Sequence, residues 1–261
     1  MKRILTVIAS IGIIGLGFIS KKKSAAISKE TMSVAIIDSY APVAVLELFT
    51  SEGCSSCPPA DRLLPELVKL DPNVIALSFH VDYWNRLGWK DPFSSSEFSD
   101  RQRQYGEQFH LGSVYTPQLV LNGEYEMVGS NRSEAISAIK KILMEKAIVS
   151  ISIDDVKKEE GKLQVTCQVD GDLKKINLLA ALVQKNAVID VKAGENGGSK
   201  LSHSNVVRTF VQKPAQPKMN FEIKIPNDLA NNNWRLILYT QQKGDLKITG
   251  AAIFQPLTQN P

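Results

Sequence analysis

Cysteine is scarce in this chain of 261 residues, and its three copies limit the chemistry that the sequence can support. Three cysteines are too few for a structural zinc site with four thiolate ligands. None of them lies near the end of the N-terminal apolar run, so the sequence has no site for lipid attachment. Internal repeats and low-complexity stretches are also missing, which excludes a repeat array.

Only one apolar run approaches the length of a membrane span, and it lies at the N-terminus. Ile4 to Ile19 follows Lys2 and Arg3 and precedes three lysines and the small residues Ser24 to Ala26. The run is shorter than the roughly 20 residues of a spanning helix. Charged, apolar and small-residue parts in this order are typical of an export signal. We therefore expect residues 1–26 to be a signal peptide or an uncleaved N-terminal anchor, and the protein to be exported, either periplasmic or secreted.

A strong net charge is missing once this leader is set aside. Five of the 31 basic residues and none of the 27 acidic residues lie in positions 1–26, so the remainder has a net charge of −1. This balance excludes the basic surface that nucleic-acid binding requires. We expect no nucleic-acid partner, and a membrane contact only through the leader if it is not cleaved.

The first half of the mature chain alternates short apolar runs with helical patterns. Strands are expected at 43–49, 73–81, 117–121 and 124–129, and helices at 58–70, 94–109 and 130–147. Two parallel strands joined through a helix, then a hairpin and a final helix, are typical of a thioredoxin fold. We expect an α/β thioredoxin-like domain over residues 41–146.

The second half has a different pattern. Seven short apolar runs between residues 148 and 254 are separated by Gly, Asn, Asp, Lys and Pro turns, with little helical periodicity. This pattern predicts an all-β sandwich domain over residues 147–256. Cys167 lies in one of these runs, where Leu163, Val165 and Val169 alternate with polar residues, so we expect its thiol to face a sheet core and to be unreactive.

Cys54 and Cys57 are then the cysteines that need a function. They form a C-x-x-C motif between a predicted strand and a predicted helix, and an oxidising compartment favours disulfide chemistry for such a pair. The start of a helix favours the thiolate, so Cys54 can attack a partner disulfide and Cys57 can resolve the mixed disulfide that forms. Pro58 and Pro59 suit the first helical turn, where amides have no intrahelical acceptor.

A Thr-Pro pair 60 residues later is the second cue. Thr116 and Pro117 come immediately before a predicted strand, where a cis peptide bond would face the dithiol and leave the Thr116 backbone free to pair with a substrate chain. Ser55 and Ser56 could each donate a hydrogen bond to the Cys54 sulfur and so favour the reduced form.

Three sequence blocks resemble the secreted thioredoxin-like proteins of domain-of-unknown-function family 1223. The blocks are ELFTSEGCSSCPPAD, SFHVDYWNRLGWKDPFSS and VYTPQLVLNG, and the resemblance spans residues 41 to 254, including GENGGSKLSHSNVVRTF. The resemblance implies a thioredoxin-like fold, an attached β domain and an export signal, but no established reaction. Thioredoxins carry a buried acid under the dithiol, and Glu47 resembles it. Glu47 is expected either to carry protons for the cysteines or to be a strand-end carboxylate with a basic partner.

Polar and aromatic residues follow the second predicted strand. His80 could tune the thiolate or shuttle a proton, or it could fix the loop by hydrogen bonds, which is also the expected role of Asp82. Trp84, in an aromatic cluster with Tyr83, Leu87 and Trp89, could line a substrate groove or be core beneath a loop. The glycine-rich segment before His203 is expected to be a mobile hairpin without chemistry, although it is long enough to fold over the dithiol.

Three functions remain open at this point. The first is an exported thiol-disulfide oxidoreductase that acts on protein or small-molecule thiols and disulfides and needs no cofactor, with Cys54, Cys57, Glu47, Thr116 and Pro117 at its centre. The second is a copper-handling protein, because two thiolates and the His80 imidazole suit Cu(I). The third is a binding scaffold in which the Cys54–Cys57 disulfide is permanent.

Overall fold

The computed structural model describes residues 33–34, 40–230 and 233–256. The expected signal or anchor at residues 1–26 lies outside these residues. Among the helices of the described ranges, none is long and apolar enough to cross a membrane.

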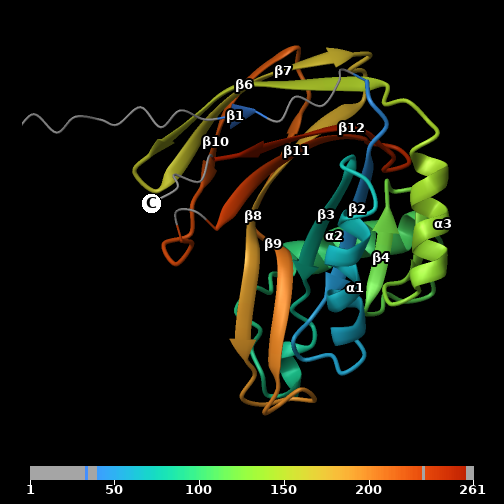
Figure 1. Cartoon of the computed structure of the whole chain (residues 1–261), viewed down its shortest axis with the longest axis vertical. Helices are drawn as coiled ribbons and strands as arrows, with labels where there is room; N and C mark the ends of the chain where they lie inside the picture. The colour runs from blue at the N-terminus through green and yellow to red at the C-terminus, as the bar shows by residue number, and fades with distance from the viewer. Residues whose placement is uncertain (1–32, 35–39, 231–232, 257–261) are drawn as a thin grey trace, which may run out of the picture. The chain divides into compact units, whose positions relative to one another are not determined.

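The first half folds as its sequence pattern predicts. Strands β2 and β3 are parallel, β4 pairs with β2 in the opposite direction, and β5 forms a hairpin with β4. Three α-helices and one short 3-10 helix accompany these strands (Figure 1). The elements are β2 (Ala44–Thr50), α1 (Pro58–Val68), β3 (Val74–His80), the short 3-10 helix η1 (Asn85–Leu87), α2 (Ser96–Gln108), β4 (Gln118–Leu121), β5 (Tyr125–Val128) and α3 (Arg132–Ile142).

Local sequence signals explain where these elements begin and turn. The Ser95 hydroxyl accepts a hydrogen bond from the Glu97 amide at 3.2 Å and caps α2, while the Asn131 side chain caps α3 in the same way. Asn122 and Gly123 both have positive φ, 48° and 69°, which the tight turn between β4 and β5 requires.

All seven runs expected in the second half are strands. They are β6 (Val149–Glu159), β7 (Lys162–Gly171), β8 (Ile176–Asp190), β9 (Lys200–Pro214), β10 (Lys218–Lys224), β11 (Trp234–Gln242) and β12 (Ile248–Gln255). Strands β6, β7 and β10 form a three-stranded sheet. The other four continue the thioredoxin sheet, which has nine strands in the order β1-β12-β11-β8-β9-β3-β2-β4-β5, with β1 at Ser33–Val34.

The separate all-β sandwich is therefore not confirmed, because β9 pairs with β3 and joins the two halves into one sheet. Burial explains the difference. Strands β8 and β11 are apolar on both faces, and Leu178, Ala180 and Leu182 belong to a different core cluster from Leu179 and Ala181. A strand that is covered on both sides belongs in the middle of a sheet rather than on one face of a sandwich. The boundary at residues 146 and 147 stays a prediction.

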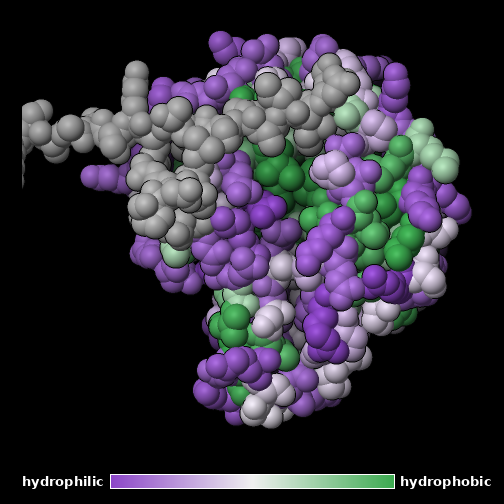
Figure 2. Space-filling model, in the orientation of Figure 1, coloured by the Kyte–Doolittle hydropathy of each residue, from purple (hydrophilic) through white to green (hydrophobic). Residues whose placement is uncertain are grey.

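The two faces of the long sheet are covered differently. One face has a continuous core across both halves, in which Phe98 and Tyr105 of α2 pack with Phe49, Phe79 and Tyr239 of the strands. The opposite face is divided: α1 and α3 cover the thioredoxin strands, and the three-stranded sheet covers β8, β11 and β12 (Figure 1). Figure 2 shows that the surface in this view is mainly hydrophilic, with hydrophobic residues showing beside α3.

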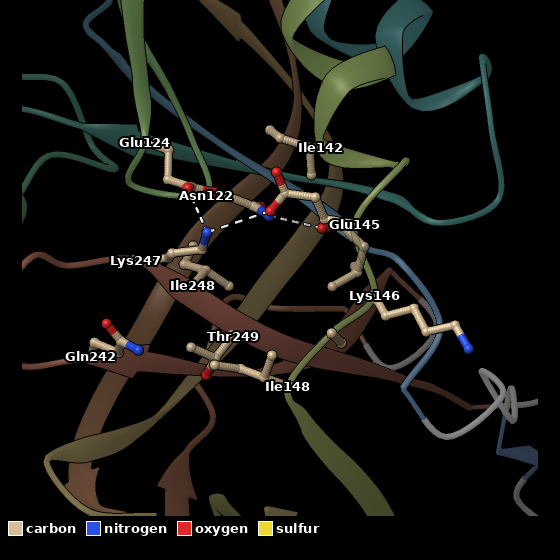
Figure 3. Close-up of a pocket in the computed structure, with 12 residues that line it drawn as sticks. Asn122, Glu124, Ile142, Glu145, Lys146, Ile148, Gln242, Lys247, Ile248 and Thr249 are labelled. Atoms are coloured by element: carbon tan, nitrogen blue, oxygen red, sulfur yellow. Dashed lines mark hydrogen bonds and ion pairs between the residues drawn. The ribbon is translucent and has the colours of Figure 1, made fainter. Parts of the chain in front are cut away.

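A hollow lies where the β4–β5 turn meets the loop before β12 (Figure 3). Lys247 Nζ is 2.6 Å from Glu124 and 3.5 Å from Glu145 there. The Asn122 side chain accepts from the Val45 amide and donates to the Val43 carbonyl, so it is fully engaged by the backbone. No lining residue of this hollow belongs to the dithiol motif, and its polar groups serve to join the two halves.

A buried ion pair lies in the core between α2 and the sheet. The Arg101 guanidinium donates to both carboxylate oxygens of Glu47 at 2.7 and 2.9 Å, and the Tyr239 hydroxyl donates to the same carboxylate at 2.6 Å. Phe210 and Tyr105 lie against the guanidinium, with ring centroids 5.1 and 5.2 Å away. Burial by itself would lower the pKa of Arg101, but the Glu47 charge raises it above its ordinary value.

Breaking this pair should be costly. Arg101→Met leaves the Glu47 carboxylate buried without a counter-charge, and we expect the free energy of unfolding to fall by about 3–5 kcal/mol. The double variant Glu47→Leu/Arg101→Met should recover most of that loss. Arg103→Met, which breaks an exposed pair with Asp100 on the same helix, should cost at most about 1 kcal/mol. Urea unfolding followed by circular dichroism measures all three, and equal losses for the two single variants would contradict the prediction.

Candidate functional site

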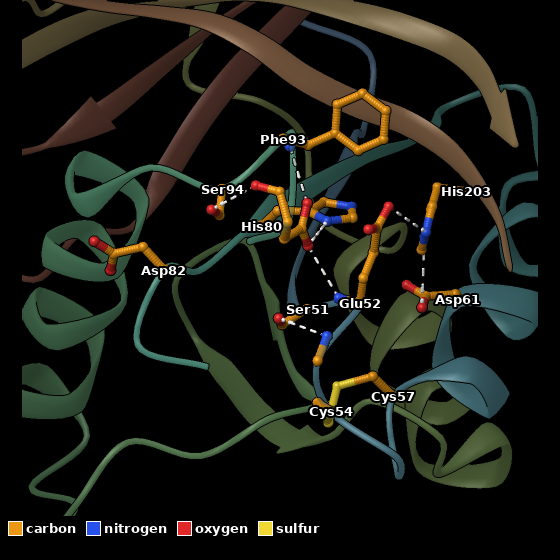
Figure 4. Close-up of polar contacts among 12 residues, drawn as sticks. Ser51, Glu52, Cys54, Cys57, Asp61, His80, Asp82, Phe93, Ser94 and His203 are labelled. Carbon is orange, nitrogen blue, oxygen red and sulfur yellow. Dashed lines mark hydrogen bonds and ion pairs between the residues drawn. A yellow bond between two sulfur atoms is a disulfide. The ribbon is translucent and has the colours of Figure 1, made fainter. Parts of the chain in front are cut away.

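The Cys54–Cys57 pair lies in the turn that joins β2 to α1. The Cys54 amide donates to the Ser51 carbonyl, the Cys57 amide donates to the Cys54 carbonyl, both at 3.2 Å, and Cys57 is the N-cap of α1. The two cysteines form a disulfide with a Cα–Cα distance of 5.4 Å, as the sequence predicts. Figure 4 shows the bridge at the start of α1. Pro58 and Pro59 occupy the first helical turn, also as predicted.

The Thr116–Pro117 peptide bond is cis and faces the disulfide. The Thr116 carbonyl oxygen is 3.8 Å from Cys54 Sγ and accepts a hydrogen bond from the Ser56 hydroxyl at 3.3 Å. Ser56 Oγ is itself 3.4 Å from Cys54 Sγ. The Trp84 indole donates to the Thr116 hydroxyl at 2.8 Å and holds this residue in place. The structure therefore brings the predicted residues Cys54, Ser56, Trp84, Thr116 and Pro117 together.

The tip of the β8–β9 hairpin covers the motif, whereas its glycine-rich sequence favours a mobile hairpin. Asn196 Nδ2 donates to the carbonyl oxygens of Glu52 and Cys54 at 2.8 and 2.9 Å. The Glu195 carboxylate accepts from the Ser55 amide at 3.0 Å, and hydrogen bonds from Ser55 hold the pKa of Glu195 below its ordinary value. Ser55 thus contacts the hairpin through its amide. Both cysteines are fully buried beneath this cover.

Glu47 lies on the opposite face of the sheet from α1. It shares its face with Val45 and Phe49, whereas Leu46 and Leu48 pack against the helix. Its carboxylate is engaged by Arg101 and Tyr239. The basic-partner interpretation of Glu47 therefore matches its surroundings, and its role as a proton carrier has no supporting contact.

His80 is also buried and engaged. His80 Nδ1 is 2.7 Å from the Asp91 carboxylate, which accepts from the Glu52 amide at 2.9 Å. Burial opposes the charge of Asp91, but the neighbouring His80 holds the pKa of Asp91 below its ordinary value. These bonds tie the loop after β3 to the turn after β2, as the loop-fixing interpretation of His80 expects. Asp82, also expected to fix the loop, accepts a hydrogen bond from Ser99 at 2.6 Å.

The alternative metal set does not form in this disulfide state. Cys54 and Cys57 are bonded to each other, and Asp91 occupies one nitrogen of His80. Across the residues that the structure describes, no group of three or more His, Cys, Asp or Glu side chains is arranged to hold a metal ion. The copper hypothesis stays a prediction about the reduced protein.

The aromatic cluster contributes hydrogen-bond donors and is not only an apolar surface that could line a groove. Trp89 Nε1 donates to the Glu52 carboxylate at 2.7 Å, in parallel with the Trp84 bond to Thr116. Tyr83 packs against the core and donates to Gln102 at 3.2 Å. Leu87 is exposed. The two tryptophans thus hold Thr116, which faces Cys54, and Glu52, which lies two residues before it.

A buried charge cluster that the sequence pattern does not predict lies next to the disulfide (Figure 4). His203 of β9 lies between two carboxylates, with Nε2 3.6 Å from Glu52 and Nδ1 3.6 Å from Asp61 (Figure 4). Burial alone would lower the pKa of His203, but Asp61 and Glu52 raise it to about 10. The hairpin thus contributes a buried histidine next to the disulfide, and whether it takes part in chemistry stays a prediction. The sequence signals were the acid two residues before Cys54, the acid one turn after Cys57 and a histidine beyond a glycine-rich turn.

The hairpin cover should control access to the disulfide. Asn196→Ala removes two hydrogen bonds, each worth about 0.5–1.5 kcal/mol. We expect dithiothreitol to reduce the native Cys54–Cys57 disulfide about tenfold faster in this variant. Alkylation and intact mass spectrometry measure the rate. Lys192→Ala, at an exposed position of the same tip, is the matched control, and equal rates for both variants would contradict a covering role for Asn196.

The charge on His203 should also stabilise the fold in a pH-dependent way. Its pKa is about 10 in the folded state against 6.5 as the ordinary value, so its contribution is complete below pH 6.5 and is lost as the pH rises toward 10. The difference in the free energy of unfolding between the wild type and His203→Gln should therefore shrink across that interval. The exposed His110→Asn is the control. A difference that stays constant from pH 6.5 to 10 would show that His203 is neutral.

Comparison with known proteins agrees with this architecture. Residues 45–241 match the family model described as "Protein of unknown function (DUF1223)". A thioredoxin of Methanocaldococcus jannaschii is 31% identical over 99 residues, which cover 38% of this chain and 94% of that protein. A crystal structure of an Agrobacterium tumefaciens protein has 26% identity and a TM-score of 0.64, covering 87% of this chain and 99% of that one.

A more distant structure shows only a similar fold. HBP35 of Porphyromonas gingivalis has 17% identity and a TM-score of 0.56, covering 86% of this chain and 80% of that one. The family match covers most of the chain and includes the C-x-x-C motif, the cis-proline and His203. The protein is a thioredoxin-like member of the DUF1223 family.

Proposed function

We propose that this protein is a thiol-disulfide oxidoreductase that exchanges disulfides through Cys54 and Cys57. The observation that carries the proposal is the disulfide at the N-terminus of α1, with Cys54 Sγ 3.8 Å from the carbonyl oxygen that precedes a cis-proline. Likeness to a thioredoxin over nearly the whole length of that protein supports the same chemistry.

The exchange follows two steps. In the reduced protein, the Cys54 thiolate attacks one sulfur of a partner disulfide, forms a mixed disulfide and releases one partner thiolate. Cys57 then loses its proton and attacks Cys54 Sγ, which forms the Cys54–Cys57 disulfide and releases the second partner thiolate. The partner gains two electrons and the protein loses two, and the same steps in reverse oxidise a dithiol partner.

The start of α1 offers the Cys54 sulfur fewer amides than a helix terminus usually has. Pro58 and Pro59 have no N–H, and the amides of Ala60 and Asp61 donate to the Cys57 carbonyl at 2.9 and 3.1 Å. Stabilisation of the thiolate then rests on the helix dipole and on the Ser56 hydroxyl, 3.4 Å from the sulfur, which would turn its proton from the Thr116 carbonyl to the sulfur in the reduced protein. This makes Ser56 the polar group on which the acidity of Cys54 chiefly depends.

The third cysteine is poorly suited to exchange. Cys167 lies in the core between the sheets, and burial, with a smaller effect of Asp154, raises the pKa of its thiol to about 12. Only the Cys54–Cys57 pair is then available for exchange, and we propose that it acts on protein or small-molecule disulfides outside the cytosol, where the predicted leader would deliver it.

Trapping variants test this function. We expect Cys57→Ser to keep one stable mixed disulfide at Cys54 after treatment with oxidised glutathione, because the resolving thiol is missing. The wild type should return to its internal disulfide, and Cys54→Ser should trap none. Intact mass spectrometry under native conditions measures each product, and Cys167→Ser is the control that should behave as the wild type.

Two results would overturn the proposal. A native Cys54–Cys57 disulfide that dithiothreitol cannot reduce until the protein is unfolded would identify a structural disulfide and a scaffold role. Copper bound in a one-to-one ratio after anaerobic purification, and lost in Cys54→Ser, would favour metal handling instead.

A further inference from the structure

A buried group that can exchange a proton with Cys57 is needed for the second step of the proposed reaction, and Glu47 is on the wrong face of the sheet. Asp61 lies on the correct side. Cys57 has helical dihedrals, φ −78° and ψ −36°, and the Asp61 amide donates to its carbonyl at 3.1 Å. Residues four apart on a helix share one face, with Cβ atoms about 5–6 Å apart. From this spacing we expect the Asp61 carboxylate to exchange a proton with the Cys57 thiol directly or through one water.

Asp61 is buried, and its carboxylate faces His203 at 3.6 Å rather than at hydrogen-bond distance. Its side chain is almost fully covered, and Oδ2 has no hydrogen-bond partner among the described residues. Both ring nitrogens of His203 and Oε1 of Glu52 are also buried without a hydrogen-bond partner in that part of the chain. These four atoms face one another as two ion pairs of 3.6 Å, which is longer than a hydrogen bond, so the cluster is held by charge and its hydrogen bonds can still change.

The charges of this cluster leave room for one more proton. The neighbours of His203 come from several elements: Glu52 from the turn after β2, Asp61 from α1, His80 from β3 at a ring distance of 4.7 Å, and Phe93 from the following loop. Asp91 lies beyond His80, and Arg208 of β9 lies over the Phe93 ring. With His203 charged, Glu52 and Asp61 leave a net charge of −1 around the imidazolium.

We propose that Asp61 accepts the proton of the Cys57 thiol during resolution of the mixed disulfide, and that His203, held by Glu52, is the positioning residue for the Asp61 carboxylate. This inference rests on the proposed oxidoreductase function and adds the group that drives its second step. The Cys57 S–H bond breaks, its proton moves to Asp61, and the thiolate attacks Cys54 Sγ as the partner thiolate leaves. In the reverse direction, protonated Asp61 returns the proton to Cys57.

The two steps can be measured separately with 5,5′-dithiobis(2-nitrobenzoate). The reduced protein releases one thionitrobenzoate when Cys54 attacks the reagent and a second when Cys57 resolves the mixed disulfide. We expect Asp61→Asn to leave the first release within about twofold of the wild type at pH 7. The second release should slow by about a hundredfold, since a positioned acid–base group contributes 10²–10⁴ in rate. Stopped-flow absorbance follows both phases.

The pH profile separates proton transfer from a merely structural effect. The deficit of Asp61→Asn should vanish as the pH rises above about 8.5, the ordinary pKa of a thiol, because Cys57 then ionises without help. His203→Gln should slow the same phase by a smaller factor. Glu66→Gln, at an exposed position of the same helix, is the matched control and should match the wild type in both phases.

Each outcome decides between the hypotheses. A wild type that releases no thionitrobenzoate from Cys54 would overturn the oxidoreductase function itself. The role of Asp61 alone would be overturned if the first phase is normal in all variants and the second phase of Asp61→Asn is unchanged. A second phase of Asp61→Asn that is equally slow at every pH would overturn it as well. If Asp61→Asn does not fold, His203→Gln decides: slowing limited to the second phase below pH 8.5 supports the inference, and an unchanged second phase refutes it.

Discussion

The pairing of β9 with β3 is the contact on which the arrangement of the site depends. The two strands are parallel and share a single register pair, Ser78 with Val206. Parallel neighbours need a long connection, and here more than a hundred residues, including β8, lie between them. Because β9 lies beside β3, His203 enters the space above the start of α1 and the hairpin tip reaches the cysteines. Without this pairing, the first half would keep a thioredoxin-like sheet, but its dithiol would lack both its cover and its buried cation.

Buried charge in this fold is divided between the two faces of one sheet. On the α2 face, Glu47 and Arg101 neutralise each other within a shell of aromatic rings, which suits a permanent structural contact. On the α1 face, His203 lies between Glu52 and Asp61 at 3.6 Å from each, with ring nitrogens that lack hydrogen bonds. The first pair is satisfied and the second cluster is not, and proton transfer needs groups whose bonds can change. The alternation of side chains along β2 places Glu47 on the α2 face, whereas Glu52 and Asp61 come from the turn after β2 and from α1.

Sequence patterns sufficed for the local elements and the exchange motif, and failed where distant segments meet. The C-x-x-C, the first-turn prolines and the Thr116–Pro117 bond are encoded within short windows, so their arrangement could be predicted. The position of β8 and β11 in the sheet could not be predicted, because an apolar run does not indicate the strand with which it pairs. His203 is separated from Asp61 by 142 positions, and its hairpin has the glycine content of an ordinary turn. Only the pairing of β9 with β3 makes that histidine part of the site.

The covered disulfide is compatible with exchange because its cover is held by few contacts. Cys54 and Cys57 are fully buried, yet Ser55 and Ser56 between them are exposed, so the sulfurs lie just beneath the surface. Three hydrogen bonds hold the hairpin tip over them: Asn196 donates two to backbone carbonyls, and Glu195 accepts one from the Ser55 amide. At about 0.5–1.5 kcal/mol each, these three bonds cost about 1.5–4.5 kcal/mol to open, which is within the range of local fluctuations of a folded protein. A structural disulfide packed inside a core would need global unfolding instead. The hairpin tip can therefore shield Cys54 from thiols that bind nonspecifically. It can still admit a partner that replaces the hydrogen bonds between the tip and the backbone around Cys54.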